Sequence, residues 1–356
     1  MGDQGRTDAQ PARFGGQSLA LVAIVKDEAE NVDRFIAAAR LYVSHATIVD
    51  TGSTDGTLDA VYQFDCPVTV ESRPWVNFGH NRSEALALAR GTADWLLALD
   101  ADMTVEVDPD FVPDPAVDAY MLRMGSADFE YRLPLLLRGD LPWESRGAVH
   151  EYTCLPDRAY VGVPTDKVRV TTHGDRSSPE KSRWHLSLLE AEMAADPGNS
   201  RAVFYAANTL RDLGDPRALA MYERRMKMGG WAEEVFYSKY RRALLLPTWP
   251  AQVMALIEAW EFRPTRLEPA YELAKGLNYR GQHHAALGFA RTPVVPSADS
   301  LFVHTGVWRW GMDFERSIAE WHAGDRDESR RLGERLLTID IPADVRAAVE
   351  RNLTFC

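Results

Sequence analysis

Short apolar runs alternate with segments of helical spacing through the first hundred residues. Runs without alternation lie at residues 18–25, 46–49 and 92–100, and a further strand is predicted at residues 68–71. Runs of this length without alternation are typical of strands that are covered on both faces. Apolar positions at helical spacing lie between them, at residues 29–42, 58–64 and 79–90. Strands and helices that alternate at this pitch predict a doubly wound, mostly parallel α/β sheet.

Alternating apolar and polar positions replace these runs after residue 117. They predict strands that contain Tyr120, Leu122 and Met124, then Tyr131, Leu133 and Leu135, and a last strand at residues 168–173. Residues 174–180, GDRSSPE, are polar and rich in residues that break helices and strands. We therefore expect the α/β domain to span residues 18–175.

Only helical patterns follow residue 181. They lie at residues 182–195, 200–213, 217–228, 233–262, 314–323, 327–337 and 343–352. Gly214 recurs as Gly281, about two repeat lengths of 34 residues further on. This spacing predicts an α-solenoid of helical pairs over residues 181–356. The aromatic residues of this half either line a groove for a partner or, as we expect for most of them, fill the core between repeats.

Composition limits the class of protein and the compartment that we expect. The chain has 356 residues, a hydrophobic content of 46% and a formal net charge of -12, which fits two globular domains and argues against a nucleic-acid-binding surface. Its three cysteines match no metal spacing and no disulfide framework. No apolar segment is long enough to cross a membrane, and residues 1–17 lack the apolar core of a signal peptide. We expect a soluble cytoplasmic protein with a disordered tail at residues 1–17.

Two acids, Asp100 and Asp102, end the last of the apolar runs. Ligands of open α/β sheets bind at the carboxyl ends of the strands. Carboxylates at that edge can hold a divalent cation, which in turn binds the phosphates of a nucleotide. The alternative is a turn that merely ends a strand. The two common glycine-rich phosphate-binding motifs, G-x-G-x-x-G and G-x-x-x-x-G-K-[ST], are absent.

Four motifs in a fixed order include these acids. They are IVKDEAENV, IVDTGSTDGT, RSEALALA and WLLALDADM. The set resembles the family 2 glycosyltransferases of the GT-A fold, over about residues 19–173. The resemblance implies that a sugar is transferred, with inversion, from a nucleotide-sugar donor. In the second half, the string ANTLRDLGDPRALAMYERRM resembles a tetratricopeptide repeat.

The resemblance to family 2 also implies roles for single residues. The residues implied to bind the nucleotide sugar are Ile24, Val25, Lys26, Glu28, Asp50, Arg82, Asp100 and Ala101. Asp102 is implied to bind the metal. Two departures from the family pattern occur, because Thr51 follows Asp50 where a second acid is common, and Ser83 follows Arg82 where Asn is common. Arg82 is the candidate that faces the diphosphate, and its alternative is a solvated side chain or an ordinary ion pair.

An H-E pair, His150 and Glu151, lies where this family builds the acceptor side of its cleft. Inverting transfer needs one base to take the proton of the acceptor. We expect Glu151 to be that base, with His150 orienting it or the acceptor; the alternative is a core histidine beside a surface acid. His173 is the expected further metal ligand, because neutral imidazole is acceptable to Mn²⁺. Its alternative is a plain loop histidine.

Two functions from different classes remain open at this point. The first is a metal-dependent glycosyltransferase that uses Mn²⁺ or Mg²⁺ and a nucleoside-diphosphate sugar, with uridine as the expected base, and a peptide, protein or glycan as acceptor. The second is a catalytically silent GT-A and tetratricopeptide scaffold that binds a protein partner. A nucleotidyltransferase is a weaker third interpretation, because its glycine-rich loop is missing. The helical domain either binds the acceptor or forms a homodimer.

Overall fold

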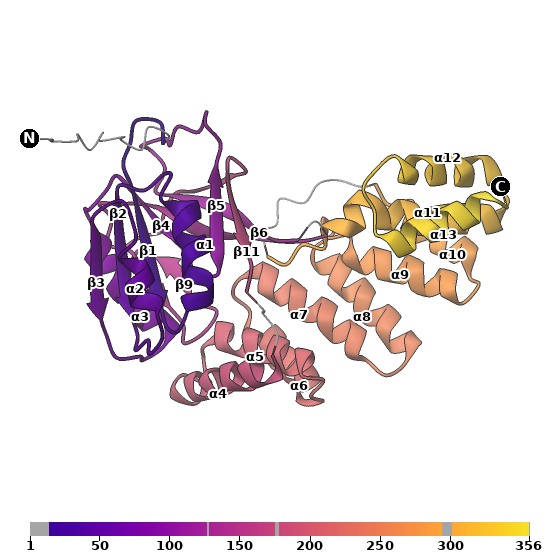
Figure 1. Ribbon diagram of the computed structural model, residues 1–356. Helices are drawn as coiled ribbons and strands as arrows, with labels where there is room; N and C mark the ends of the chain where they lie inside the picture. Colours follow the sequence, from indigo (N-terminus) through magenta and orange to yellow (C-terminus); the bar gives the residue numbers. More distant parts are fainter. Residues whose placement is uncertain (1–13, 127, 175–177, 294–300, 356) are drawn as a thin grey trace, which may run out of the picture. The chain divides into compact units, whose positions relative to one another are not determined.

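The computed structural model describes residues 14–126, 128–174, 178–293 and 301–355. The chain forms two compact units. The first comprises Met1–Met124 and Arg132–Glu192, and the second comprises Gly125–Tyr131 and Met193–Cys356. Figure 1 draws the strands of the sheet in indigo to magenta and the last helices of the second unit in yellow.

A seven-stranded sheet organises the first unit, with the strand order β10-β6-β7-β4-β1-β2-β3 (Figure 1). The four apolar runs form β1 (Leu19–Val25), β2 (His45–Asp50), β3 (Val68–Ser72) and β4 (Trp95–Ala98). Both β2 and β4 pair with β1 in parallel, and β3 pairs with β2 in parallel. The doubly wound, mostly parallel fold is therefore confirmed.

Three helices connect these strands. They are α1 (Ala29–Ala39), α2 (Thr57–Val61) and α3 (Phe78–Ala89). Every residue of β1 is buried, as the uninterrupted apolar run predicts. Asn77 caps α3, because its side-chain oxygen accepts a hydrogen bond of 2.8 Å from the backbone N–H of His80. This cap fixes where α3 begins, close to the carboxyl end of β3.

The remaining strands are partly antiparallel. They are β5 (Met103–Val107), β6 (Ala119–Ser126), β7 (Phe129–Arg138), β8 (Glu144–Arg146), β9 (Tyr152–Cys154), β10 (Gly162–Thr165) and β11 (Val168–Thr172). Antiparallel pairs form between β4 and β7, β5 and β11, and β8 and β9. The alternating pattern predicts β6, β7 and β11. It misses β5, which is as long as β11, and it misses β8, β9 and β10, which are too short for alternation to be recognised.

The helix α4 (Pro179–Ala195) runs from the first unit into the second. We expected the α/β domain to end near residue 175 and the helical domain to begin at residue 181. In the structure, residues up to Glu192 belong to the first unit. The rings of Trp184 and His185 pack against Phe78 at 5.9 and 6.1 Å. Helical periodicity does not reveal which neighbour a helix packs against, so the sequence could not place this boundary.

The expected disordered tail lies mostly in residues 1–13, which are outside the described residues. Phe14 lies inside them and is only 1% exposed. Its ring meets that of Phe111 edge-on at 5.6 Å. The prediction of a disordered tail therefore does not hold at Phe14. Among the described helices, none has the length and apolar character that a membrane crossing requires.

The second unit consists of successive helices (Figure 1). They are α5 (Ser200–Asp212), α6 (Arg217–Met228), α7 (Ala232–Leu245), α8 (Trp249–Phe262), α9 (Glu268–Tyr279), α10 (His283–Ala290), the π-helical turn Val307–Gly311, α11 (Met312–Ala323), α12 (Arg326–Leu337) and α13 (Ala343–Leu353). Each helix from α5 to α12 contacts the next one along the chain. The described residues thus form an α-solenoid of successive helix pairs, as expected.

The recurring glycines have a common structural reason. Gly214 follows α5 and Gly281 follows α9, with left-handed φ angles of +69° and +70°. Glycine adopts this conformation without strain and commonly ends helices. The repeat signal in the sequence is therefore a repeated helix cap. Most aromatic residues of this half are core, as expected, with Phe204, Tyr222 and Phe236 fully buried.

Candidate active site

The residues that the sequence singles out for donor binding meet at one edge of the sheet. Because β1, β2 and β4 are parallel neighbours, their carboxyl ends lie together. Asp50 is the last residue of β2 and pairs in register with Val25 of β1. Glu28 follows β1, and Asp100 follows β4 by two residues. The edge is therefore rich in carboxylates that come from three separate loops.

The loops after β1 and β2 are joined by side-chain hydrogen bonds. The carboxylate of Asp27 accepts a 2.7 Å bond from the backbone N–H of Thr54, and the N–H of Asp27 donates to the hydroxyl of Ser53 at 3.0 Å. In return, the carboxylate of Asp55 accepts from the N–H of Ala29 at 3.1 Å. Sequence analysis missed these contacts, although the clustering of Asp, Ser and Thr beside glycines is a signal for such turns.

Asp50 is 4% exposed, and its carboxylate accepts backbone N–H bonds from Gly52 and Ser53. The carboxylate therefore also stabilises its own turn. Thr51 occupies the position where the family often has a second acid. Its hydroxyl donates to the carbonyl oxygen of Val25 at 3.2 Å and is buried. This departure from the family pattern thus replaces a carboxylate by a hydrogen bond to the first strand.

The other residues expected to bind the nucleotide sugar differ in how they are exposed. Ile24, Val25 and Ala101 are buried, so a ligand reaches them mainly through their backbone atoms. Lys26 is exposed. Burial of Glu28 raises the pKa of its carboxyl, and the negative charges of Asp102 and Asp100 raise it further, against a hydrogen bond from Asn31. Glu28 therefore shares an electrostatic environment with the D-x-D element.

Asp102 and His173 are brought together by the antiparallel pairing of β5 with β11. The backbone N–H of His173 donates to the carbonyl oxygen of Asp102 at 2.8 Å, and the Nε2 of His173 lies 2.8 Å from the hydroxyl of Thr104. A Cβ at Gly174 would lie 2.1 Å from the Oδ2 of Asp102, so only glycine leaves room for this carboxylate. Among the described residues, no group of three His, Cys, Asp or Glu side chains could hold a metal ion.

Arg82 connects the two sides of the site. Its Nη2 donates to the Oδ1 of Asp100 and its Nε to the Oε1 of Glu151, both at 2.7 Å. The side chain of Arg82 is only 10% exposed. Burial alone would lower the pKa of Arg82, but the charges of Asp100 and Glu151 outweigh it, so the pKa is raised. The structure thus places the expected diphosphate-facing arginine in a buried double ion pair with the acids on its two sides.

Glu151 and His150 lie on the loop between β8 and β9. His150 has a left-handed backbone with φ of +52° and is exposed, whereas the side chain of Glu151 is 16% exposed. The ring of His150 lies 5.6 Å from that of His185 in α4. Burial lowers the pKa of His185, although the charge of Glu151 acts in the opposite direction. His185 is thus a neighbour of the H-E pair that sequence analysis assigned to the other domain.

An aromatic cluster surrounds this neighbour. The ring of Trp184 lies 6.0 Å from that of Trp75, and Trp75 meets Phe78 edge-on at 4.8 Å. Trp184 is 41% exposed despite these contacts. The cluster joins the start of α3 to α4. The aromatic residues near residue 75 and near residue 184 give no sequence signal that links them.

Comparisons with known proteins identify relatives of parts of the chain. Residues 21–114 match the model of the family described as Glycosyl transferase family 2. A TPR repeat-containing protein of Synechococcus elongatus is 36% identical over 93 residues, which are 25% of this chain and 22% of that protein. An uncharacterized glycosyltransferase of Rickettsia felis is 31% identical over 86 residues, which are 24% of this chain and 29% of that protein. The chain thus spans less than a third of the curated relatives it matches.

Solved structures give weaker likenesses. MamA is 17% identical with a TM-score of 0.35, over 46% of this chain and 95% of that chain. Glucosyl-3-phosphoglycerate synthase from Mycobacterium tuberculosis is 20% identical with a TM-score of 0.21, over 25% of this chain and 34% of that chain. The family match, the sheet and the solenoid together define the class of protein: the chain carries a family 2 glycosyltransferase domain in its amino-terminal region, followed by a tetratricopeptide-like helical domain.

Proposed function

We propose that this chain is a glycosyltransferase that moves a sugar, with inversion, from a nucleoside-diphosphate sugar to an acceptor. The observation that supports it most is the double ion pair of Arg82. Through this arginine, Asp100 of the donor edge and Glu151 of the H-E loop are held on either side of one guanidinium. A transfer reaction needs a donor group and a base within reach of one another, and this contact supplies that geometry.

In the proposed reaction, Glu151 takes the proton of the acceptor as the acceptor attacks the anomeric carbon. The bond from that carbon to the diphosphate breaks in the same displacement, so the configuration at the carbon inverts. Within the described part of the chain, the hydrogen bond from Arg82 goes to Oε1 of Glu151, which leaves Oε2 for the acceptor proton. His150, which is exposed on the same loop, is proposed to orient the acceptor.

A divalent cation, Mn²⁺ or Mg²⁺, supplies positive charge to the leaving diphosphate when it is bound. We propose that Asp102 and His173 hold it. Two protein ligands are enough for such an ion, because substrate phosphates and waters complete its shell. The acidic edge fits a cation, since Asp102 and Asp100 lie close enough to Glu28 for their negative charges to raise the pKa of its carboxyl. One carboxylate and one imidazole as metal ligands suit Mn²⁺.

The nucleotide is proposed to lie along the ends of β1, β2 and β4, with uridine as its base. Ile24, Val25, Lys26, Glu28 and Asp50 would surround the base and ribose, and Asp100 with Ala101 would contact the ribose. The interlocked loops after β1 and β2 support this proposal, because a preformed cradle loses little entropy when it binds. The acceptor is a peptide, a protein or a glycan, and the helical domain is proposed to bind it or to form a homodimer in the cytoplasm.

Calorimetric titration of the full chain with UDP, GDP and dTDP tests the donor site. Each nucleotide is titrated with Mn²⁺ and again with a chelator. We expect metal-dependent binding of UDP, and loss of the metal dependence in Asp102→Ala with an unchanged circular dichroism spectrum. Asp108→Ala, in the loop after β5, is the matched control. Failure of all three nucleotides to bind would overturn the proposal.

The second candidate function is a silent scaffold that binds a protein partner. It is favoured by the helical solenoid of the second unit, because repeats of this type commonly present a surface to a protein partner. A scaffold would neither hydrolyse a nucleotide sugar slowly in water nor transfer it. Measurement of donor hydrolysis in the absence of acceptor therefore distinguishes the two functions.

A further inference from the structure

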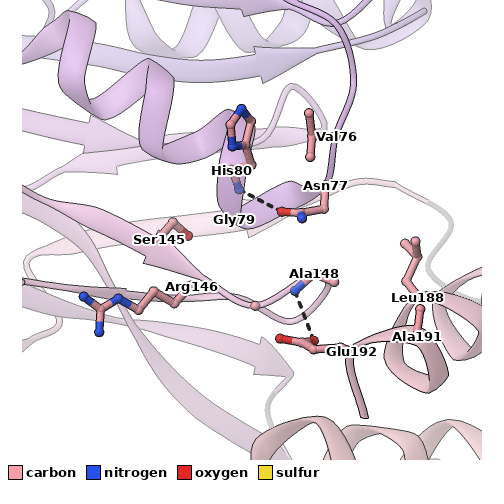
Figure 2. A pocket seen from close by; sticks show the side chains of 11 residues that line it. Val76, Asn77, Gly79, His80, Ser145, Arg146, Ala148, Leu188, Ala191 and Glu192 are labelled. Atoms are coloured by element: carbon pink, nitrogen blue, oxygen red, sulfur yellow. Dashed lines mark hydrogen bonds between the residues drawn. The ribbon is translucent and has the colours of Figure 1, made fainter. Parts of the chain in front are cut away.

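A hollow of about 490 Å³ lies in the first unit beside the loop that carries Glu151. Figure 2 shows it between the start of α3, the end of β8 with the loop that follows, and α4. Its walls include Val76, Gly79, Ala148, Leu188 and Ala191, which are apolar or lack a side chain. The volume lies in the range of small-ligand sites in proteins.

The polar side chains around this hollow are already engaged. Asn77 caps α3 through the N–H of His80, and the carboxylate of Glu192 accepts from the N–H of Ala148 at 3.3 Å (Figure 2). Arg146 pairs with Glu144 at 3.0 Å. An occupant with many hydroxyl groups, such as a hexose, would therefore leave most of them without partners, at a cost for each.

Ser145 is the exception among these polar side chains. It lines the hollow, is 5% exposed, and its hydroxyl has no hydrogen-bond partner within the described chain. A buried hydroxyl without a hydrogen-bond partner is uncommon in proteins, and a ligand could supply that partner. The hollow thus matches an occupant with an apolar body and one hydrogen-bonding group.

The position of the hollow connects it to the proposed reaction. Gly147 lines it, and a Cβ at Gly147 would lie 3.3 Å from the Cα of Glu151. Arg82, which holds Glu151, lies less than one helical turn beyond Gly79 of the wall. The hollow therefore borders the backbone of the proposed base.

We propose that the hollow receives an apolar side chain of a polypeptide acceptor, next to the residue that takes the sugar. The backbone amide of that acceptor segment meets the hydroxyl of Ser145, and the following nucleophilic side chain reaches Glu151. This inference rests on the proposed glycosyl transfer and narrows its acceptor to a polypeptide with an apolar residue beside the modified one.

The test uses the full chain, the donor that titration identifies, and capped pentapeptides with a central Ser, Thr or Cys. The flanking residues are Leu in one set and Gly in the other, and octyl glucoside and maltose serve as lipid-like and glycan probes. We expect Leu peptides to be glycosylated at least about tenfold faster than Gly peptides, as burial of an apolar side chain in a pocket provides. Equal rates, or preferred transfer to either sugar probe, would overturn the proposal.

Variants that fill or open the hollow sharpen the test. Ala191→Trp places a large ring in the hollow from an exposed helix position, and Leu188→Ala removes part of its wall. Both should abolish the preference for Leu peptides while donor hydrolysis stays within twofold of the parent. Ala37→Trp, at an exposed position of α1, is the matched control and should change neither rate. A retained Leu preference in Ala191→Trp would contradict the assignment.

Hydrolysis of the donor in the absence of acceptor separates failure of the proposed glycosyl transfer from failure of the occupant assigned to the hollow. Absence of hydrolysis and of transfer in the parent chain means that the proposed function fails, and this inference fails with it. Hydrolysis without a preference for Leu peptides means that the proposed glycosyltransferase function holds and that only the assignment of the hollow is wrong.

Discussion

Each unit of the molecule buries an arginine beside carboxylates, and the two arrangements differ in what they connect. In the first unit, Arg82 joins Asp100 and Glu151, which lie on different loops. In the second unit, Arg266 pairs with Glu268, two residues further along the chain, and both side chains are fully buried. Arg82 thus connects two loops that are far apart in the sequence, whereas Arg266 pairs with a residue close to it in the sequence.

The surroundings of Arg266 explain its role. Its guanidinium also donates to the carbonyl oxygens of Leu301 and Phe302 and lies 4.5 Å from the centre of the Phe236 ring. All these partners belong to the helical core, where an unpaired charge would be costly. The acids that Arg82 holds instead lie where a donor and an acceptor are proposed to meet. We therefore expect the buried ion pair to serve folding in the second unit and, as proposed, positioning in the first.

Replacement of the proposed base should have the largest effect in the first unit. Glu151→Gln keeps an oxygen that can accept from Arg82 but cannot take a proton. We expect turnover to fall by about 10²–10⁴-fold, with unchanged binding of the donor nucleotide. Steady-state kinetics and calorimetry measure the two quantities, and Glu106→Gln, at an exposed position of β5, is the control. Equal losses in turnover and donor binding would contradict the role of base.

Matched substitutions of the two arginines test the comparison directly. Lys keeps the positive charge but cannot make both hydrogen bonds of a guanidinium. In Arg82→Lys we expect turnover to fall by about 10²-fold, because a base displaced by about 1 Å is misplaced for reaction. In Arg266→Lys we expect a loss of about 2 kcal/mol in the free energy of unfolding and normal turnover per folded molecule. Urea unfolding measures the free energy of unfolding, and steady-state kinetics measures turnover. If both variants change both quantities equally, the two arginines do not differ in role.

The two units should also differ in their response to acid. Burial, together with the charges of Arg241, Arg266 and Arg211, lowers the pKa of His304 in the second unit to about 4. The unfolded chain therefore binds a proton that the folded chain does not between about pH 6.5 and the folded value. Stability is lost as the pH falls through this range, by about 3 kcal/mol in total.

Urea unfolding at pH 7 and at pH 4.5 measures this loss. His304→Phe lacks the imidazole and should lose less stability between the two pH values than the parent. Glu28 in the first unit has the opposite sign, because burial raises the pKa of its carboxyl and the folded chain retains a proton that the unfolded chain releases as the pH rises. An identical acid response in His304→Phe and the parent would rule out this histidine as the cause.

The smallest effect is expected at Gly174. In Gly174→Ala the added Cβ meets the carboxylate of Asp102, which must rotate. We expect metal-dependent nucleotide binding to weaken by roughly tenfold, as when the support of a metal ligand is removed. Gly288→Ala, in α10, adds a Cβ with nothing within 4 Å and is the control. Calorimetry with and without Mn²⁺ measures both variants, and an unchanged affinity would place the metal away from Asp102.

The acids of the proposed donor edge could be predicted from the sequence, because the information that places them is local. Uninterrupted apolar runs mark buried strands, and the acids that follow them must lie at the carboxyl edge of a parallel sheet. This logic predicts the positions of Asp50, Asp100 and Asp102 without knowledge of side-chain contacts. The pairing of Arg82 with Glu151 was not predictable, because it joins a helix to a loop between strands too short to recognise.

The helix α4 shows the same limit on a larger scale. Its apolar spacing is indistinguishable from that of the solenoid helices, so the sequence assigned it to the second domain. Its residues Trp184, His185, Leu188 and Glu192 instead pack against the first unit, beside Phe78 and the loop that carries His150. The partner of an amphipathic face is a tertiary property, which one sequence without contacts does not contain.

The antiparallel pairing of β5 with β11 has a consequence for the order in which the protein is made. It sets Asp102 beside His173, although a long stretch of chain separates them. Closure of so long a loop costs entropy before the new contacts repay it, which makes this pairing slow relative to local structure. During synthesis, Asp102 leaves the ribosome well before β11 does. The metal site that we propose at Asp102 and His173 is therefore incomplete in the nascent chain until β11, the last strand of the first unit, has been added.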